Sequence, residues 1–236
     1  MSLQASVGWC EPQVRDELPQ LRIALEPVQL PQRAAPSRPS PEPVRQRLAA
    51  LSDRFNGAKA VNLRREPVTA AYRVFFRHIG LDPDVVRTPI EAAVLERMLD
   101  GGFLSRCLLA DVLLIALLDT GVPVWALDAE KIEGEVGVRT GRSGETLGGV
   151  ADVPLDSGAA EPSAADDDGQ AVGAGQLVVA DARCALALLF ADPAPAHQPS
   201  GRSRRLLLYA LQVAGVPWLA IEESLWICRS ALEAVT

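Results

Sequence analysis

The sequence predicts an α+β fold in which a mixed β-sheet, or two small sheets, is flanked by helices. Hydrophobic residues make up 48% of the 236 residues, which is enough to bury a sizeable core. The stretch 71–128 contains three helical patterns followed by one strand-like run. Helices and strands interleave in an order that right-handed crossovers cannot link throughout, which favours α+β organisation in one domain, residues 1–236.

The N-terminal quarter predicts a strand, a loop and a helix. Leu21–Leu25 alternates between apolar and polar residues, as a half-buried strand does, and a short helical segment around Pro12–Leu18 precedes it. Residues 27–43 contain six prolines and no apolar period, so they predict a proline-rich linker. Val44, Leu48 and Leu51 then form the apolar stripe of a short helix.

The central part predicts two amphipathic helices. Tyr72, Phe75 and Ile79 recur at helical spacing, and Gly80 follows them where a left-handed C-terminal residue is expected. Thr88–Glu91 is a capping box, with a proline pre-set for the first turn, and starts a helix that ends at Gly101 and Gly102.

A buried helix and a strand are expected next. Leu108–Leu118 is apolar except for Asp111, and Val122–Leu127 is rich in β-forming residues. Further strands are predicted at Val136–Thr140, Leu177–Ala180 and Ala185–Phe190.

The last two segments predict helices. Leu206–Val213 is apolar nearly all round, which indicates burial on most sides, and residues 218–232 carry one apolar stripe. Residues 151–175 are acidic and rich in glycine and alanine, so we expect a disordered loop there.

Composition restricts the classes of partner. The net charge of −7 argues against a protein that coats nucleic acid non-specifically, so an RNA partner would need a local basic patch. The longest apolar stretch, Cys107–Leu118, is too short to span a bilayer, and no secretory signal is recognisable, so a cytoplasmic location is expected. The four cysteines show no CxxC pairing, which favours free thiols over disulfides or a metal site, and no cofactor is expected.

Ordered sequence words over more than a hundred residues carry a resemblance. They are Ala71-Tyr72-Arg73 with Phe75-Phe76, Gly80-Leu81-Asp82-Pro83, Arg87-Thr88-Pro89 with Glu91-Ala92, Arg97, Ala110-Asp111, Thr120-Gly121-Val122-Pro123-Val124, Leu127-Asp128, Lys131-Ile132-Glu133-Gly134, Val138-Arg139, Gly144-Glu145 and Leu177-Val178-Val179-Ala180-Asp181. In this order the chain resembles the editing module of the phenylalanyl-tRNA synthetase beta chain, and more closely the freestanding proteins built from that module alone.

The resemblance implies an α+β fold, a tRNA partner and hydrolysis of mischarged aminoacyl-tRNA in trans. In the synthetase the module cleaves the ester that links a wrong amino acid, chiefly tyrosine, to the terminal adenosine. Such an ester needs a positioned water more than it needs a catalytic triad or a metal ion. The sequence accordingly shows no GxSxG, HExxH or phosphate-loop motif.

The family's site residues are replaced in this chain. Leu114 stands at the family's asparagine position and Trp125 at its histidine position. The family's glycine-rich turn corresponds to residues 189–192, which contain no glycine. The family's glutamate that reads the tyrosine hydroxyl corresponds to a position in segment 206–211, which is apolar except for Tyr209. The pocket therefore either accepts another amino acid or no longer edits.

Five residues are candidates for substrate binding. They are Arg87, Glu91, Asp111, Trp125 and Glu145. For Glu91 a capping role is favoured over ligand contact, and for Asp111 structural hydrogen bonding is favoured over a pocket role. Arg87 binds either a phosphate or a neighbouring acid, and Glu145 either makes a turn or lines the pocket. Trp125 faces either core or cleft, and stacking on a terminal adenine is its less favoured role.

Clustered arginines are the candidates for tRNA contact, although solvated surface is the default expectation for each. They are Arg73, Arg77, Arg202, Arg204 and Arg205. His78 and His197 are expected to be solvated, and Asp128 to cap a turn.

Two hypotheses of function stay open. The first is a freestanding tRNA-binding relative of the editing module that hydrolyses mischarged tRNA. The second is a non-catalytic binding module of the same fold for a small amino-acid-like ligand or a protein. An open cleft flanked by arginines favours the first, and a closed aliphatic cleft without a basic rim favours the second.

Overall fold

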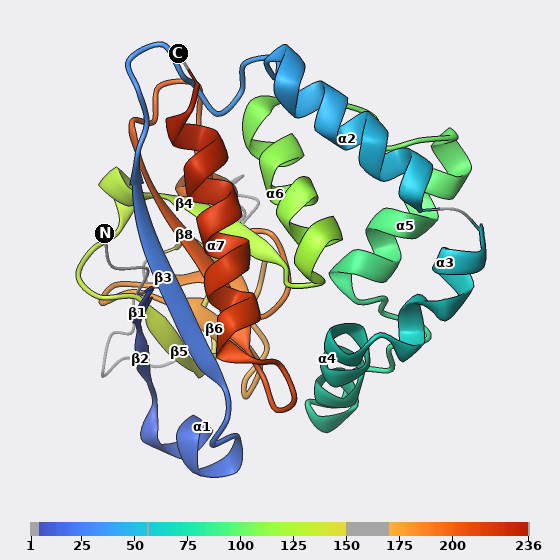
Figure 1. Cartoon of the computed structure of the whole chain (residues 1–236). Helices are drawn as coiled ribbons and strands as arrows, with labels where there is room; N and C mark the ends of the chain where they lie inside the picture. Colours follow the sequence, from blue (N-terminus) through green and yellow to red (C-terminus); the bar gives the residue numbers. More distant parts are fainter. Residues whose placement is uncertain (1–4, 56, 150–169, 236) are drawn as a thin grey trace.

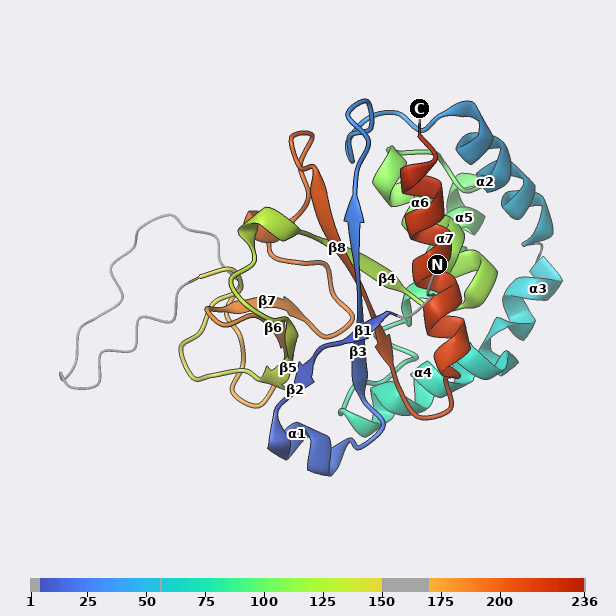
Figure 2. The ribbon, with the colours of Figure 1, turned by 60° about the vertical axis from the view of Figure 1, so that its left-hand side comes forward.

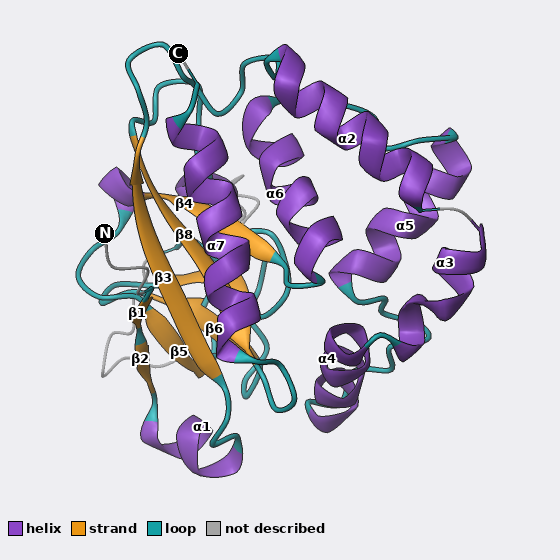
Figure 3. Cartoon of the chain, in the orientation of Figure 1, coloured by secondary structure: helices purple, strands orange, loops and turns teal. Residues whose placement is uncertain are grey.

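The computed structural model describes residues 5–55, 57–149 and 170–235 and has the predicted α+β fold. Two sheets of four strands each are present in these residues. In Figure 2 most of the helices cover one side of the first sheet, and the second sheet lies on its other side. The same division into a helical and a strand-rich half is seen in Figure 3.

The first sheet is antiparallel and has the order β1-β3-β8-β4. Its strands are β1 (Ser6–Val7), β3 (Arg22–Gln29), β8 (Arg205–Gln212) and β4 (Val124–Asp128). Tyr209 in the inner strand β8 lies opposite Leu25 on one side and Trp125 on the other. The register therefore places residues from the beginning, middle and end of the chain side by side.

The second sheet is mixed and has the order β2-β5-β6-β7. β2 (Trp9–Cys10) pairs with β5 (Gly137–Thr140) in parallel. β6 (Leu177–Ala180) and β7 (Ala185–Leu188) continue the sheet in antiparallel fashion. Short helix α1 (Pro12–Glu17) links the two sheets, because it follows β2 and precedes β3.

Helices α6 (Leu108–Thr120) and α7 (Trp218–Glu233) lie side by side near the first sheet (Figure 1). Outside them lie α2 (Glu42–Arg54), α3 (Gly57–Asn62), α4 (Pro67–His78) and α5 (Pro89–Asp100). Three 3₁₀ turns complete the description: Leu63–Arg65, Ala129–Lys131 and Pro195–His197.

The prediction of a helix at Leu206–Val213 was wrong, because this segment is strand β8. A short run that is apolar nearly all round fits a buried helix and a buried strand equally well. The segment forms a strand because it pairs with β3 on one side and β4 on the other. Both of its faces are covered, which explains why nearly all of its residues are apolar.

Parts of the predicted proline-rich linker and of the predicted acidic loop belong to the folded structure. Of the proline-rich stretch 27–43, residues 27–29 belong to β3, and Leu30 and Ala34 are buried. Most of the acidic segment, residues 150–169, lies outside the described residues. The remaining part is ordered, since Val172 is buried and donates its N–H to the carbonyl of Glu145.

Within the described residues, each helix is either too short or too polar to cross a membrane.

Candidate functional site

The two most deeply buried arginines each pair with a glutamate. Arg73 of α4 is 7% exposed, and its guanidinium lies 2.6 Å from Glu91 and 2.7 Å from Asp84. Arg64 adds a second contact to Glu91 at 3.1 Å. The expectation that Arg73 is solvated was wrong, because these carboxylates replace its water. The positive charge of Arg73 is therefore balanced by Glu91 and Asp84 within the protein.

Glu91 also completes the predicted capping box. Its carboxylate accepts hydrogen bonds from the backbone N–H and the hydroxyl of Thr88, the residue before α5. Arg87, next to this cap, is exposed and makes no hydrogen bond or ion pair with any other described residue. Glu91 is thereby assigned to structure, and Arg87 stays a prediction.

Asp111 holds the start of α6. Its carboxylate accepts from the hydroxyls of Ser40 at 2.6 Å and Ser105 at 2.5 Å and from the backbone N–H of Arg106 at 2.8 Å. It is 1% exposed, so these donors are needed to offset its burial. This geometry agrees with the structural role that the sequence analysis favours for Asp111.

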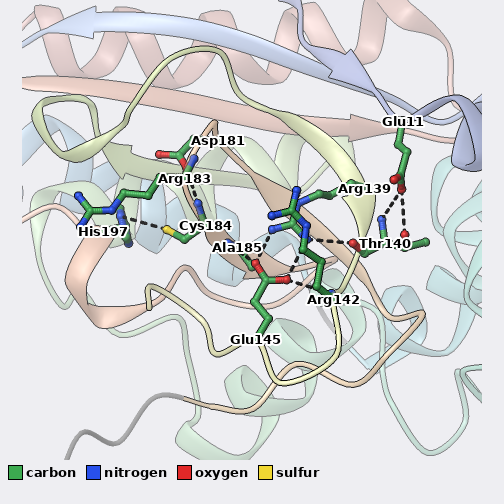
Figure 4. Close-up of polar contacts among 10 residues, drawn as sticks. All are labelled: Glu11, Arg139, Thr140, Arg142, Glu145, Asp181, Arg183, Cys184, Ala185 and His197. Atoms are coloured by element: carbon green, nitrogen blue, oxygen red, sulfur yellow. Dashed lines mark hydrogen bonds and ion pairs between the residues drawn. The ribbon is translucent and has the colours of Figure 1, made fainter. Parts of the chain in front are cut away.

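Glu145 and Arg139 form the second buried ion pair (Figure 4). One Glu145 oxygen accepts from Arg139 Nη1 at 2.8 Å, and the carboxylate also accepts the backbone N–H groups of Arg142 and Ala185 at 3.0 and 3.1 Å. Burial raises the pKa of Glu145, but these donors outweigh it, and its pKa lies below the ordinary value. Glu145 therefore fixes the turn after β5 onto β7.

Cys184 and His197 also face one another in Figure 4, with Sγ and Nε2 separated by 3.9 Å. The expectation that His197 is solvated was wrong, since it is 8% exposed. Burial raises the pKa of the Cys184 thiol to about 11 and lowers the pKa of His197. A catalytic thiol needs a depressed pKa, so at neutral pH this pair holds a neutral thiol beside a neutral imidazole and has no activated nucleophile.

Trp125 belongs to a cluster of aromatic side chains at the centre of the molecule. Its ring stacks on Tyr209 with centroids 5.5 Å apart, and the edge of Phe190 meets it at 5.9 Å. Phe190 also contacts Tyr72, Phe75 and Phe76 of α4. Among the described residues other than glycine, Phe190 has the only positive φ, 63°. That conformation is unusual for a bulky residue, and the surrounding rings hold it in place.

An open cavity of about 270 Å³ lies beside this cluster, and we call it the Trp125 cleft. Most of its wall is apolar, and Asp192 contributes the only carboxylate among the described lining residues. The lining residues are Pro36, Ser37, Cys107, Leu109, Ala110, Leu113, Trp125, Ala126, Asp192, Pro193, Gln198 and Pro199.

The two loops that contribute Pro36, Ser37, Gln198 and Pro199 to the Trp125 cleft also carry four arginines. Arg33 and Arg38 flank the lining residues Pro36 and Ser37, while Arg202 and Arg204 follow Gln198 and Pro199. Arg38 donates to the carbonyl of Arg33 at 2.9 Å and Arg204 to that of Ala34 at 2.7 Å, so the second contact joins the two loops.

The charges of these four arginines are not neutralised within the described part of the chain. All four side chains are exposed, and none forms an ion pair with another described residue. We call these four residues, Arg33, Arg38, Arg202 and Arg204, the arginine rim. Both loops lie at the end of the sheet where β3 finishes and β8 begins (Figure 1).

Asp128 fixes one of these loops to β4. Its carboxylate accepts from the hydroxyl of Ser203 at 2.6 Å and from the backbone N–H of Glu130 at 3.1 Å. The predicted cap of a turn is therefore confirmed, and the same residue holds the loop that carries Arg202 and Arg204.

The predicted tRNA-contact residues are not all neighbours. Arg202 and Arg204 belong to the arginine rim, and Arg205 is exposed at the start of β8, where it lies 3.4 Å from Glu130. Arg77 is exposed on α4, near the paired Arg73 and away from these loops.

Of the substrate-binding candidates, Trp125 lines this cleft, and Asp111 lines another cavity together with Leu114, the residue at the family's asparagine position. Sequence reasoning did not single out Asp192, Arg33 or Arg38. Asp192 could have been found, because it lies in the turn where the family that the sequence resembles has glycines. Nothing in the chain order marks the two arginines, since they lie in a stretch predicted as a linker.

No group of three or more histidine, cysteine or acidic side chains in the described ranges is arranged to hold a metal ion. Comparison with protein-family models and with curated proteins gave no match for the chain.

Proposed function

We propose that this protein binds the aminoacylated 3′ end of a tRNA in the Trp125 cleft and hydrolyses the ester of a mischarged amino acid there. One observation carries the proposal. Trp125, the turn 189–192 and the segment 206–211 are distant in sequence, and the resemblance assigns all three to the editing pocket. Trp125 and Asp192 of that turn line the Trp125 cleft, and Tyr209 of the segment 206–211 stacks on the ring of Trp125.

The arginine rim supplies the electrostatic part of the proposal. Guanidinium groups bind phosphates through paired N–H donors, and those of the rim have no carboxylate partner in the described chain. Because the whole chain has a net charge of −7, a polyanion is repelled by most of its surface. Binding of RNA is then confined to such a local patch.

The wall of the cleft suits an apolar aminoacyl group. Leu109 and Leu113 offer apolar contact, and the carboxylate of Asp192 can accept the α-ammonium group. The glutamate that reads the tyrosine hydroxyl in the synthetase has no counterpart in the described lining, so we expect an apolar amino acid as the one removed.

Hydrolysis requires only water and orientation. Water adds to the ester carbonyl carbon, the bond to the ribose oxygen breaks, and that oxygen takes up the proton that the water loses. Holding the ester and a water molecule in place can supply much of the rate for such an activated bond.

A non-catalytic binding module is the second candidate. It is favoured by Leu114 and Trp125, which stand where the family that the sequence resembles has polar residues. In this case the Trp125 cleft binds an amino-acid-like ligand or the tRNA end without turnover.

The test combines binding and deacylation. Purified protein is mixed with tRNAs that carry matched and mismatched amino acids, and both retention of tRNA and release of amino acid above buffer are measured. We expect release from at least one mismatched pair and weaker release for Asp192→Asn. Retention without release from any pair would favour the binding module.

The arginine rim is tested separately. The double variant Arg38→Ala/Arg202→Ala should weaken tRNA binding and lower the slope of log affinity against log salt concentration by about 2, one for each lost phosphate contact. Arg22→Ala/Arg65→Ala removes the same charge from exposed sites elsewhere, Arg22 being at the opposite end of β3. Equal losses in both double variants would contradict the assigned surface.

A further inference from the structure

A second and larger cavity, of about 570 Å³, lies between α1, the end of α4 and the second sheet. We call it the α1 cleft. It shares no lining residue with the Trp125 cleft, and its residues are Gln13, Val14, Glu17, Leu18, His78, Ile79, Leu81, Thr140, Ala174, Gly175, Gln176, Leu177, Leu188 and Leu189. Its size is that of a small-molecule site.

Both helical walls of the α1 cleft are anchored. Glu11, which precedes α1, accepts the backbone N–H and the hydroxyl of Thr140 at 2.9 Å each (Figure 4). Chiefly through the backbone contact, Thr140 holds the pKa of Glu11 below its ordinary value. On the other side, the hydroxyl of Tyr72 in α4 donates to the carbonyl of Leu211 at 2.8 Å. The cleft is therefore formed before a ligand arrives.

The chemistry of the wall is divided. Leu177, Leu188 and Leu189 give the sheet side an apolar surface, while α1 presents the carboxylate of Glu17 and α4 the imidazole of His78. Both of these side chains are exposed, and neither makes a hydrogen bond or an ion pair with another residue of the described chain. An acceptor for a cation and a donor for an anion thus border one cavity whose sheet side is apolar.

We propose that the α1 cleft binds a zwitterionic apolar ligand, an α-amino acid or a dipeptide. Its ammonium group contacts Glu17, its carboxylate contacts His78, and its apolar side chain lies on the leucines. The inference is independent of the proposed tRNA function, since it uses other residues and a ligand without phosphate.

The experiment measures binding of free leucine, phenylalanine and Leu-Leu dipeptide to the full chain by isothermal titration calorimetry. We expect saturable binding that is weakened about tenfold by Glu17→Gln and by His78→Asn, since each removes one charge-assisted contact. N-acetyl-leucine, which has no ammonium group, should lose a similar factor with the unmodified protein. The better of the amino acids and the dipeptide identifies the source of the zwitterion.

Two control variants locate the ligand. Glu223→Gln removes an exposed carboxylate from α7 and should leave the affinity unchanged, whereas Asp192→Asn reports any binding of the same ligands in the Trp125 cleft. Absence of saturable binding, binding that both Glu17→Gln and His78→Asn leave unchanged, or binding that only Asp192→Asn weakens would each overturn the proposal. Glu17 and His78 are exposed, so their variants are expected to fold, and thermal unfolding checks this.

Discussion

Arginines occupy two contrasting environments in this protein. Arg73 and Arg139 are buried, and each one lies against a buried glutamate, Glu91 or Glu145. The arginine rim of the Trp125 cleft is exposed and has no carboxylate partner in the described chain. A buried guanidinium without a partner would be very costly, whereas an exposed one keeps its water and can exchange it for a ligand phosphate. The first group therefore serves stability and the second is available for binding.

The largest effect should follow from breaking the more enclosed pair. Arg139→Met leaves the carboxylate of Glu145 buried without its main partner, and we expect the free energy of unfolding to fall by about 3–5 kcal/mol in chemical denaturation. The double variant Arg139→Met/Glu145→Gln removes both charges and should recover part of the loss. A loss below about 1 kcal/mol in the single variant would show that Glu145 finds other donors.

A smaller effect is expected at the other pair. Arg73→Met removes one partner of Glu91, but Arg64 remains 3.1 Å from the same carboxylate. We expect a loss of about 2 kcal/mol, again from denaturant unfolding. Arg64→Ala alone should cost less, because that side chain is half exposed. If Arg73→Met costs as much as Arg139→Met, Arg64 provides no compensation.

Lowering the pH should reduce the stability that the paired glutamates provide. The pKa values of Glu145 and Glu11 are lowered in the folded protein from an ordinary value of 4.5. Their contribution to stability is then fully present above pH 4.5 and is lost as the pH falls through the folded pKa. Urea midpoints measured from pH 6 downward should fall more steeply in the parent protein than in Glu145→Gln. Parallel curves would argue that other carboxylates control acid unfolding.

The smallest effect on stability is expected at the arginine rim. Arg38→Ala and Arg202→Ala should each change the free energy of unfolding by no more than about 0.5 kcal/mol, because exposed side chains lose little on truncation. Thermal unfolding of both variants beside the parent protein checks this. A large loss in either would mean that the rim residue supports the loop, and its effect on tRNA binding would then have to be measured in a lysine variant.

Local patterns were sufficient for most elements. The capping box of Thr88 and Glu91, the helix around Tyr72 and the strand Leu177–Ala180 all occur where periodicity and turn residues predicted them. The helix prediction for residues 206–213 was wrong, because an apolar run of this length does not distinguish a buried strand from a buried helix. The strands that pair with this segment lie far away in sequence. The prediction that His197 is solvated was wrong for a similar reason, since polar neighbours in sequence do not exclude burial by distant segments.

The candidate site was predictable only in part. Trp125 and the turn 189–192 were marked by their positions in the resemblance, and both border the Trp125 cleft. Glu91, Asp111 and Glu145 were candidates for substrate binding, and the carboxylate of each accepts hydrogen bonds that hold the structure. A sequence shows that an acid is surrounded by apolar residues, but it does not show which donors will reach it.

The sequence by itself determined the α+β class and the helix boundaries around α4 and α5. Those properties depend on composition, periodicity and contacts a few residues apart. Only the tertiary structure decided which arginines are paired inside and which stay exposed on the two loops that help to line the Trp125 cleft. Charge pairing and cleft formation depend on distances between segments as far apart as Ala34 and Arg204, which chain order does not specify.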